Sequence, residues 1–350
     1  MKLVATFAII RYLDELPFPW RSKVPPRYPK RFMSSHAGHD LSHICFEGQA
    51  PTRPERCCTP SACHAAVAVA PEDDLDEFLA WVLGRAGLDA AAYRSPPLHR
   101  RLPACLRTLK VHSTHAAREL LERKPHLLDR VVSSLLIGVT EFFREPAVFD
   151  SLSTQILPAL ASHNRPLRIW SAACSNGAEL YSMAILLAEA GLLEGSFLLG
   201  TDCRGDAIEQ ARGGRYEASA LRPVPPAMRD TYFEPAGRYW RPVEFLRRAV
   251  HWKAADLLTA VERGPWDILL WRNAAIYLKP YRAESVWRRL ASALAAEGAL
   301  ITGKAERPPH DAGLQRAERC VYRMASRREV ALAYPRASLH ESCNSLERDS

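Results

Sequence analysis

The sequence lacks any long apolar run. None of its apolar stretches approaches the roughly 18–20 residues that a membrane-spanning helix needs. The apolar start of the chain, residues 1–10, is followed at once by Arg11 and Asp14 and by no small-residue cleavage site, as a secretory leader would require. We therefore expect a soluble, cytoplasmic protein that is not inserted in a membrane.

Concentrated charge of one sign is also missing. Lys and Arg number 47 and Asp and Glu 39, which gives a net charge of +8 at pH 7, and the excess is spread along the chain. Proteins that bind nucleic acids usually gather their basic residues on one face or in one segment. We therefore expect no nucleic-acid partner.

The nine cysteines show no regular spacing. A chain of this length buries enough apolar surface to fold without disulfides, and zinc sites need cysteine and histidine pairs at short fixed spacings, which are absent here. The sequence therefore predicts neither a disulfide framework nor a metal site, and it suits a reducing compartment. No internal repeat is visible, and we expect a monomer.

The N-terminal half of the chain divides into two segments of different character. Residues 1–70 contain many prolines and no apolar period, which predicts a disordered extension. Helical spacing of apolar residues over 72–88, 114–124 and 126–139 predicts a small all-α domain that spans 71–138. Pro103 interrupts a further helical pattern, so that helix either kinks or begins near Pro103.

Short apolar runs alternate with helical patterns after residue 162. The runs 165–172, 196–202, 266–273, 298–305 and 320–326 predict strands, and the patterns 176–191 and 282–297 predict helices between them. This alternation is typical of an α/β fold with a doubly wound sheet. The proline-rich stretch 213–250 does not suit a crossover helix, so we predict a small antiparallel insertion there. Residues 331–350 are expected to be a disordered tail.

Doubly wound sheets bind ligands at the carboxyl ends of their strands. The first such turn, S-A-A-C-S-N-G at 171–177, has small residues that would let a ligand approach the backbone, and Gly177 is placed for a tight entry into the next helix, but the turn lacks the G-x-G-x-x-G pattern of dinucleotide sites. The second strand ends in Asp202, where a carboxylate accepts ribose hydroxyls in such folds. These features favour an adenosyl ligand without a pyrophosphate, and an Asp that only caps the next helix is the alternative.

Four motifs, in this order, resemble the CheR family, the S-adenosylmethionine-dependent methyltransferases that esterify glutamates of bacterial chemoreceptors. They are T-E-F-F-R at 140–144, W-S-A-A-C-S-N-G-A-E-L-Y-S at 170–182, D-L-L at 256–258 and W-R-N-A-A-I-Y at 271–277. The resemblance covers about 72–326. It implies a Rossmann-like methyltransferase domain at 139–330, a small all-α N-terminal domain before it and an inserted antiparallel β-subdomain at about 213–250.

The resemblance also implies site residues. It implies catalytic roles for Arg144, which would orient a carboxylate, and for Tyr277, which would line the methyl-transfer channel. The cofactor-contacting positions that it implies are Thr140, Arg144, Glu179, Asp202, Asp256, Leu257, Arg272 and Asn273. The chain departs from the family pattern at several positions, which are Gly138, Asn176, Ala178, Leu180 and Asp256, the last in place of an Asn.

The implied reaction is methylation of glutamate side chains with S-adenosylmethionine as cofactor, which gives a methyl ester and S-adenosylhomocysteine. A glutamate carboxyl is already ionised at pH 7, so positioning matters more than a general base. Because several family positions are altered, a cofactor-impaired binding or scaffold module is the alternative. A small-molecule methyltransferase on the same fold is a weaker one.

The partner that the resemblance implies is a methyl-accepting chemoreceptor or a similar helical signalling protein. Four basic residues, Arg100, Arg101, Arg107 and Lys110, fall within one predicted helical segment. Such a surface would complement an acidic receptor bundle, or it is only a solvated charged face.

Overall fold

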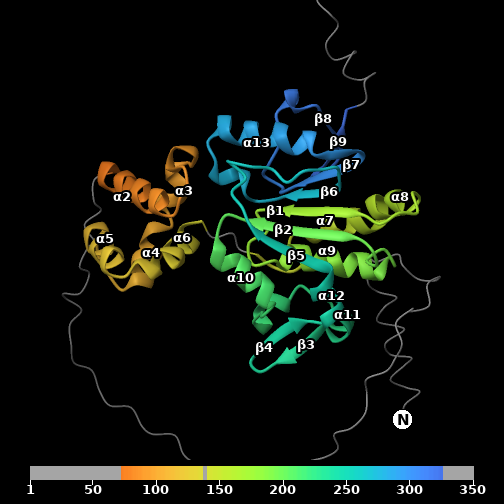
Figure 1. The fold of residues 1–350 in the computed structure, drawn as a ribbon, viewed down its shortest axis with the longest axis horizontal. Coiled ribbons are helices and arrows are strands. Elements are labelled where there is room, and N and C mark those ends of the chain that lie inside the picture. The colour runs from red at the N-terminus through yellow and green to blue at the C-terminus, as the bar shows by residue number, and fades with distance from the viewer. Residues whose placement is uncertain (1–71, 137–139, 326–350) are drawn as a thin grey trace, which may run out of the picture. The chain divides into compact units, whose positions relative to one another are not determined.

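The computed structural model describes residues 72–136 and 140–325 (Figure 1). The expected extension 1–70, the expected tail 331–350 and Gly138 lie outside the described residues. Within the described ranges, no helix has the length and apolar character needed to cross a membrane.

Residues 72–136 form short helices around one apolar core. In chain order they are α2 (Glu72–Arg85), η1 (Ala90–Ala92), α3 (Ser95–His99), α4 (Leu102–Leu109), α5 (Thr114–Arg123), η2 (Pro125–Leu127) and α6 (Leu128–Leu135). Val82 of α2, Cys105 of α4, Leu121 of α5 and Val131 of α6 belong to this core, and each is fully buried. Each helix therefore turns one apolar stripe inward, as its sequence spacing indicates.

The basic residues expected on one helical segment do not share a helix. Pro103 stands in the first turn of α4, in line with a helix that begins near it. Arg100 follows the end of α3, Arg101 precedes α4, and Lys110 follows the end of α4 in a left-handed conformation, so only Arg107 lies inside α4. The expectation of one basic helix is wrong, because the proline ring leaves no room for a preceding helical turn and the chain breaks between α3 and α4.

A seven-stranded sheet organises residues 140–325. Its strands are β1 (Arg168–Ala172), β2 (Phe197–Asp202), β5 (Val250–Ala254), β6 (Trp266–Trp271), β7 (Leu294–Thr302), β8 (Leu314–Glu318) and β9 (Val321–Met324). They lie in the order β5-β2-β1-β6-β7-β9-β8, in which the first five strands are parallel to one another and β9 is antiparallel to both of its neighbours, β7 and β8. The expected Rossmann-like α/β sheet is thereby confirmed.

Helices cover both faces of the sheet (Figure 1). On one face α9 (Ala178–Glu189) shares a core with Ile169 of β1 and Ile268 of β6, together with the continuous stretch of α7 (Pro146–Ser151), η3 (Leu152–Ile156) and α8 (Leu157–Ala161). On the other face Trp287 of α13 (Pro280–Ser292) meets Trp271 of β6 with ring centroids 4.1 Å apart. Burial on both faces explains why the central strands are continuous apolar runs.

An insertion lies between α10 (Gly205–Gly213) and β5. It contains η4 (Ala218–Leu221), α11 (Pro226–Tyr232), the antiparallel strands β3 (Phe233–Ala236) and β4 (Tyr239–Pro242), and α12 (Glu244–Ala249). The turn of the hairpin needs a positive φ, which Gly237 supplies at 65°. The antiparallel pairing agrees with the sequence expectation, whereas the two short helices that flank the hairpin were not expected.

Candidate active site

One cavity opens at the carboxyl ends of β1, β2, β5 and β6. The cavity is lined by every residue that the family resemblance implied, namely Thr140, Arg144, Glu179, Asp202, Asp256, Leu257, Arg272, Asn273 and Tyr277. The structure therefore brings these distant parts of the sequence to one place.

The loop between β1 and α9 forms one wall of the cavity. Ala173 and Ser175 have positive φ angles of 60° and 52°, and Gly177 has a φ of 85° immediately before α9. A side chain at Gly177 would meet the Trp252 ring of β5 at 2.5 Å. Gly177 thus makes the tight entry into α9 that the sequence predicted, and it also leaves room for a tryptophan of the protein itself.

Asp202, at the end of β2, is buried and already hydrogen-bonded. Its Oδ2 accepts the backbone N–H of Ser175 at 2.8 Å, and its Oδ1 accepts the backbone N–H and the Nε–H of Arg204, both at 3.0 Å. The N-cap position of α10 belongs to Arg204. Asp202 thus stabilises the turn before α10 without capping the helix directly, and the same carboxylate lines the cavity.

Asp256 follows β5 and faces the same cavity beside two leucines. Burial raises the pKa of this carboxyl above its ordinary value, and a hydrogen bond from the backbone N–H of Leu258 to Oδ1 at 2.9 Å acts in the opposite direction. Leu257 and Leu258 add apolar surface to the wall. A carboxylate next to apolar side chains suits an aromatic base that carries an amino group.

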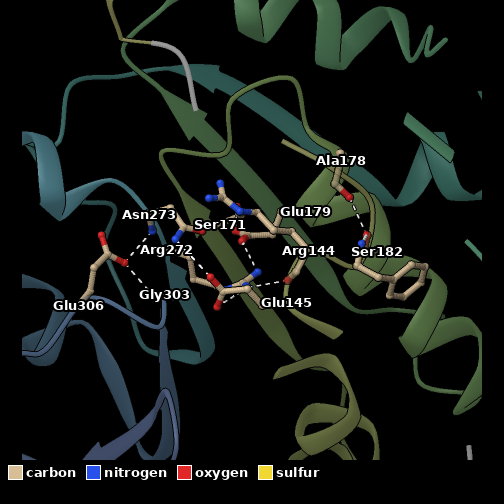
Figure 2. A network of polar contacts seen from close by, with 11 residues as sticks. Arg144, Glu145, Ser171, Ala178, Glu179, Ser182, Arg272, Asn273, Gly303 and Glu306 are labelled. Atoms are coloured by element: carbon tan, nitrogen blue, oxygen red, sulfur yellow. Dashed lines mark hydrogen bonds and ion pairs between the residues drawn. The ribbon is translucent and has the colours of Figure 1, made fainter. Parts of the chain in front are cut away.

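Arg272 lies at the centre of a polar network behind the cavity (Figure 2). Its side chain is 1% exposed, and it forms ion pairs with Glu179 at 3.0 Å and Glu145 at 3.3 Å. Nη2 also donates to the backbone carbonyl of Arg144 at 2.7 Å, and Glu179 in turn accepts from Ser171 of β1 at 2.8 Å. This network joins β1, α9, β6 and the Arg144 segment, so Arg272 fixes neighbours that also line the cavity.

A second buried carboxylate, Glu306, holds the loop that follows β6 (Figure 2). It accepts the backbone N–H groups of Asn273, Ala274 and Ala275 at 2.6, 2.8 and 2.8 Å, and that of Gly303 at 2.9 Å. Burial nevertheless raises the pKa of the Glu306 carboxyl above its ordinary value, against these four hydrogen bonds. The loop leads into η5 (Ala275–Tyr277), so Glu306 positions Asn273 and Tyr277 without lining the cavity itself.

The T-E-F-F-R segment directs Arg144 into the cavity by burying its neighbours. Phe143 is buried, packs against Phe149 with centroids 5.3 Å apart, and donates its backbone N–H to Ser182 of α9 at 2.9 Å. Phe143 and Glu145 both have positive φ angles, 53° and 61°. Strained backbone on both sides of one residue is typical of positions that a site requires.

Residues 72–136 also contribute to the cavity wall. Tyr93 is buried there, close to Cys203, Asp256 and Asp202, and burial is the main reason that its phenol pKa is raised. Its segment is fixed by backbone hydrogen bonds from Arg94 to the Tyr277 carbonyl at 2.9 Å and from Lys279 to the Ala92 carbonyl at 2.8 Å. The helical part of the chain therefore closes one side of the site.

A basic hollow adjoins the cavity at Tyr277. It is lined by Arg94, Arg100, Arg101 and Ile276, together with two prolines of α3. Nη2 of Arg101 donates to the Tyr277 hydroxyl at 3.2 Å. Tyr277 lines both spaces, so it stands where a group bound in the hollow would reach the cavity.

Several residues of the site have no signal in the sequence. Tyr93, Arg204 and Glu306 lie in no motif, and each acts through a partner that is distant in the chain or supplied by the backbone. The one sequence feature that could have pointed to any of them is the position of Arg204, a charged residue two positions after the end of a predicted strand.

The side chains of the cavity fit S-adenosylmethionine. Carboxylates at two neighbouring strand ends, Asp202 and Asp256, offer acceptors for hydroxyl and amino groups, and the leucines beside Asp256 offer an apolar wall. Glu179 and Arg144 at the other side provide a charge of each sign, as the zwitterionic amino-acid part requires. Three or more His, Cys, Asp or Glu side chains do not gather into a metal-binding group in residues 72–136 and 140–325.

A family model described as "CheR methyltransferase, SAM binding domain" matches residues 138–323. The chain belongs to the CheR methyltransferase family. A chemotaxis protein methyltransferase of Listeria monocytogenes is 29% identical over 246 residues, which are 69% of this chain and 94% of that protein. Chemotaxis protein methyltransferase 2 of Pseudomonas aeruginosa is 32% identical, with coverage of 66% and 85%, and that of Vibrio parahaemolyticus is 33% identical, with coverage of 53% and 70%.

As a member of the CheR family, the protein is a methyltransferase and its cofactor is S-adenosylmethionine. The matched region contains all seven strands of the sheet except the last residue of β9, and it contains the separate segments that hold Arg144, Glu179, Asp202 and Asn273. Tyr93 and the basic hollow residues of α3 lie before it, in the helical part of this CheR protein.

Proposed function

We propose that the protein methylates glutamate side chains of a chemoreceptor or of a similar helical signalling protein in the cytoplasm. The observation that carries the proposal is the position of Tyr277, between the cavity assigned to the cofactor and a hollow lined by three arginines. An acidic protein segment matches the charge of that hollow. A small neutral substrate would gain no electrostatic attraction from the arginines of that hollow.

The residues of the site bind and orient the two reactants. S-adenosylmethionine, when bound, supplies a methyl group that is electrophilic because it is attached to a sulfonium. Arg144 holds the substrate carboxylate or that of the cofactor's methionine part, since a guanidinium offers two parallel donors to a carboxylate. Tyr277, held by Arg101, lines both the hollow and the cavity. No base is needed, because the glutamate is ionised at pH 7.

The partner is recognised through basic residues of the helical part. Arg100 and Arg101 line the hollow, whereas Arg107 and Lys110 are exposed on and after α4 and do not line it. Under the proposal, Arg100 and Arg101 act next to the reaction, and Arg107 and Lys110 add only long-range attraction. Rim charges of the latter kind mainly affect association rate and salt dependence.

The test is transfer of labelled methyl groups from S-adenosylmethionine to cognate receptors, scored as base-labile methyl esters. We expect the wild-type protein to form them and Arg144→Ala to lose on the order of 100-fold in rate, as removal of one site donor typically does. Arg101→Ala should lower the rate more than Arg107→Ala, which serves as the matched control for charge.

Calorimetric titration of S-adenosylhomocysteine separates the remaining possibilities. Binding without any ester on any receptor would overturn the substrate proposal and favour a small-molecule acceptor. A folded wild-type protein that binds a receptor but no S-adenosylhomocysteine would instead support the scaffold alternative, which the altered residues Asn176, Ala178 and Leu180 motivate.

A further inference from the structure

Arg204 is a buried cation in the wall of the cavity, and none of the family motifs contains it. It lies two residues after the end of β2, and its side chain is 8% exposed. A buried arginine needs partners, and those of Arg204 are the cavity residues Asp202 and Ser175. The arrangement is therefore part of the ligand site and not of the protein surface.

The acceptor capacity of Asp202 is almost filled. A carboxylate oxygen accepts about two hydrogen bonds. Oδ1 already accepts two, from the backbone N–H and the Nε–H of Arg204, and Oδ2 accepts one from the backbone N–H of Ser175 at 2.8 Å and a longer one from Nη2 of Arg204 at 3.4 Å. A ribose presents two neighbouring hydroxyls, and Asp202 can accept from only one of them, at the position on Oδ2 that the long 3.4 Å contact now holds.

Arg204 has N–H donors that can bind the hydroxyl for which Asp202 has no acceptor position. Its Nη2 donates to the Ser175 hydroxyl at 2.8 Å and lies 3.4 Å from Asp202 Oδ2. Nη1 carries two more N–H groups, and no residue of 72–136 or 140–325 accepts from them. Because the guanidinium is planar and its other edge faces Asp202, Nη1 lies on the side away from the carboxylate.

We propose that Arg204 is a second ribose-binding residue, which donates to one hydroxyl of the cofactor's ribose while Asp202 accepts from the other. The inference rests on the proposed function in one respect, that this cavity holds the adenosyl group. A hydroxyl is both donor and acceptor, so a carboxylate and a guanidinium side by side match a pair of hydroxyls better than a carboxylate alone.

The test pairs changes in the protein with changes in the ligand. S-adenosylhomocysteine and its 2′-deoxy and 3′-deoxy ribose analogues are titrated calorimetrically into the wild-type protein and Arg204→Met, which keeps a long stem but no donor. We expect the wild type to lose about tenfold or more in affinity when the hydroxyl bound by Arg204 is removed, as for hydrogen bonds to charged groups. In Arg204→Met, removal of that same hydroxyl should lower the affinity by no more than about twofold, since the guanidinium that would bind the hydroxyl is already absent.

Two further variants keep the result interpretable. Arg212→Met removes an exposed arginine in the last turn of the same helix, where it pairs with Glu209, and should retain the full wild-type hydroxyl dependence. Arg204→Lys keeps a charge beside Asp202 but not the planar fork, so it provides the same comparison if Arg204→Met fails to fold. In Arg204→Lys the hydroxyl dependence should also fall.

Equal hydroxyl penalties in the wild type and in the folded Arg204 variants would overturn the inference, because Arg204 would then act only on the fold. Tighter binding by Arg204→Met would also overturn it, by showing that Arg204 competes with the ribose for Asp202. These outcomes leave the proposed function intact. A wild-type protein that binds none of the three ligands would contradict the proposed function itself.

Discussion

Arg272 shows how much of the site depends on single buried charges. Its guanidinium balances Glu179 and Glu145 and holds the backbone of Arg144 (Figure 2). Breaking a buried pair leaves uncompensated charge, which costs about 3–5 kcal/mol. We expect Arg272→Ala to lower the free energy of unfolding by at least this amount, and Arg272→Lys by less, in urea titrations followed by circular dichroism.

The control for Arg272 is an arginine with exposed partners. Arg288 of α13 pairs with Asp311 and Glu284 at the surface, where ion pairs contribute at most about 1 kcal/mol. Arg288→Ala should therefore change the unfolding midpoint little. Equal losses for Arg272→Ala and Arg288→Ala would show that the buried network does not stabilise the fold.

Single residues also show where sequence reasoning succeeds and where it stops. Asp202 was predictable from the end of a strand alone, since parallel strand ends form the ligand edge of such sheets. Arg204 and Glu306 were not, because their roles depend on which backbone groups and carboxylates become buried beside them. Glu306 reaches Asn273, which lies 33 residues earlier in the chain.

At the scale of elements, Glu306 connects two segments of the chain. It joins the loop after β6 to the end of β7 through four backbone hydrogen bonds. A glutamine has one acceptor oxygen and turns an N–H₂ group toward backbone donors. We therefore expect Glu306→Gln to lose about 2–3 kcal/mol of stability, since buried donors lose their acceptor, and to lose methyl transfer with it.

The measurement for Glu306 compares two substitutions under conditions where both proteins are folded. Thermal unfolding and methyl transfer are measured for Glu306→Gln and for Glu297→Gln, an exposed glutamate on β7 that pairs with His163. The second should behave as the wild type does. If Glu306→Gln transfers methyl groups at the wild-type rate, the loop does not need this carboxylate to place Tyr277.

The elements that sequence periodicity identified are those with a buried apolar run. β1, β2, β6 and β7 are buried over most of their length, and all four were predicted. β5 (Val250–Ala254) and β8 (Leu314–Glu318) lie at the two edges of the sheet and are largely exposed, so their sequences, VHWKA and LQRAE, show no apolar run. An edge strand forms because it pairs with a neighbouring strand, and the local sequence pattern carries no information about that neighbour.

At the scale of the whole molecule, the cofactor cavity joins the helical part to the sheet. Tyr93 and Leu136 line it from one side, and the hydrogen bond from Arg94 to Tyr277 crosses beside it. A ligand at 100 times its dissociation constant stabilises the bound state by about 2.7 kcal/mol. We expect S-adenosylhomocysteine to slow hydrogen exchange at the amides of both Arg94 and Lys279. Protection confined to residues 140–325 would contradict this coupling.

The strand order has a consequence for how the chain is completed. β1 lies between β2 and β6, so Trp170 aligns with Leu199 of β2 on one side and with Leu269 of β6 on the other. β6 enters the chain roughly a hundred residues after β1, and such distant pairings form slowly because a long loop must close first. During synthesis the edge of β1 that pairs with β6 therefore stays unpaired until β6 has been synthesised. In that interval the nascent chain is most prone to aggregate or to bind a chaperone.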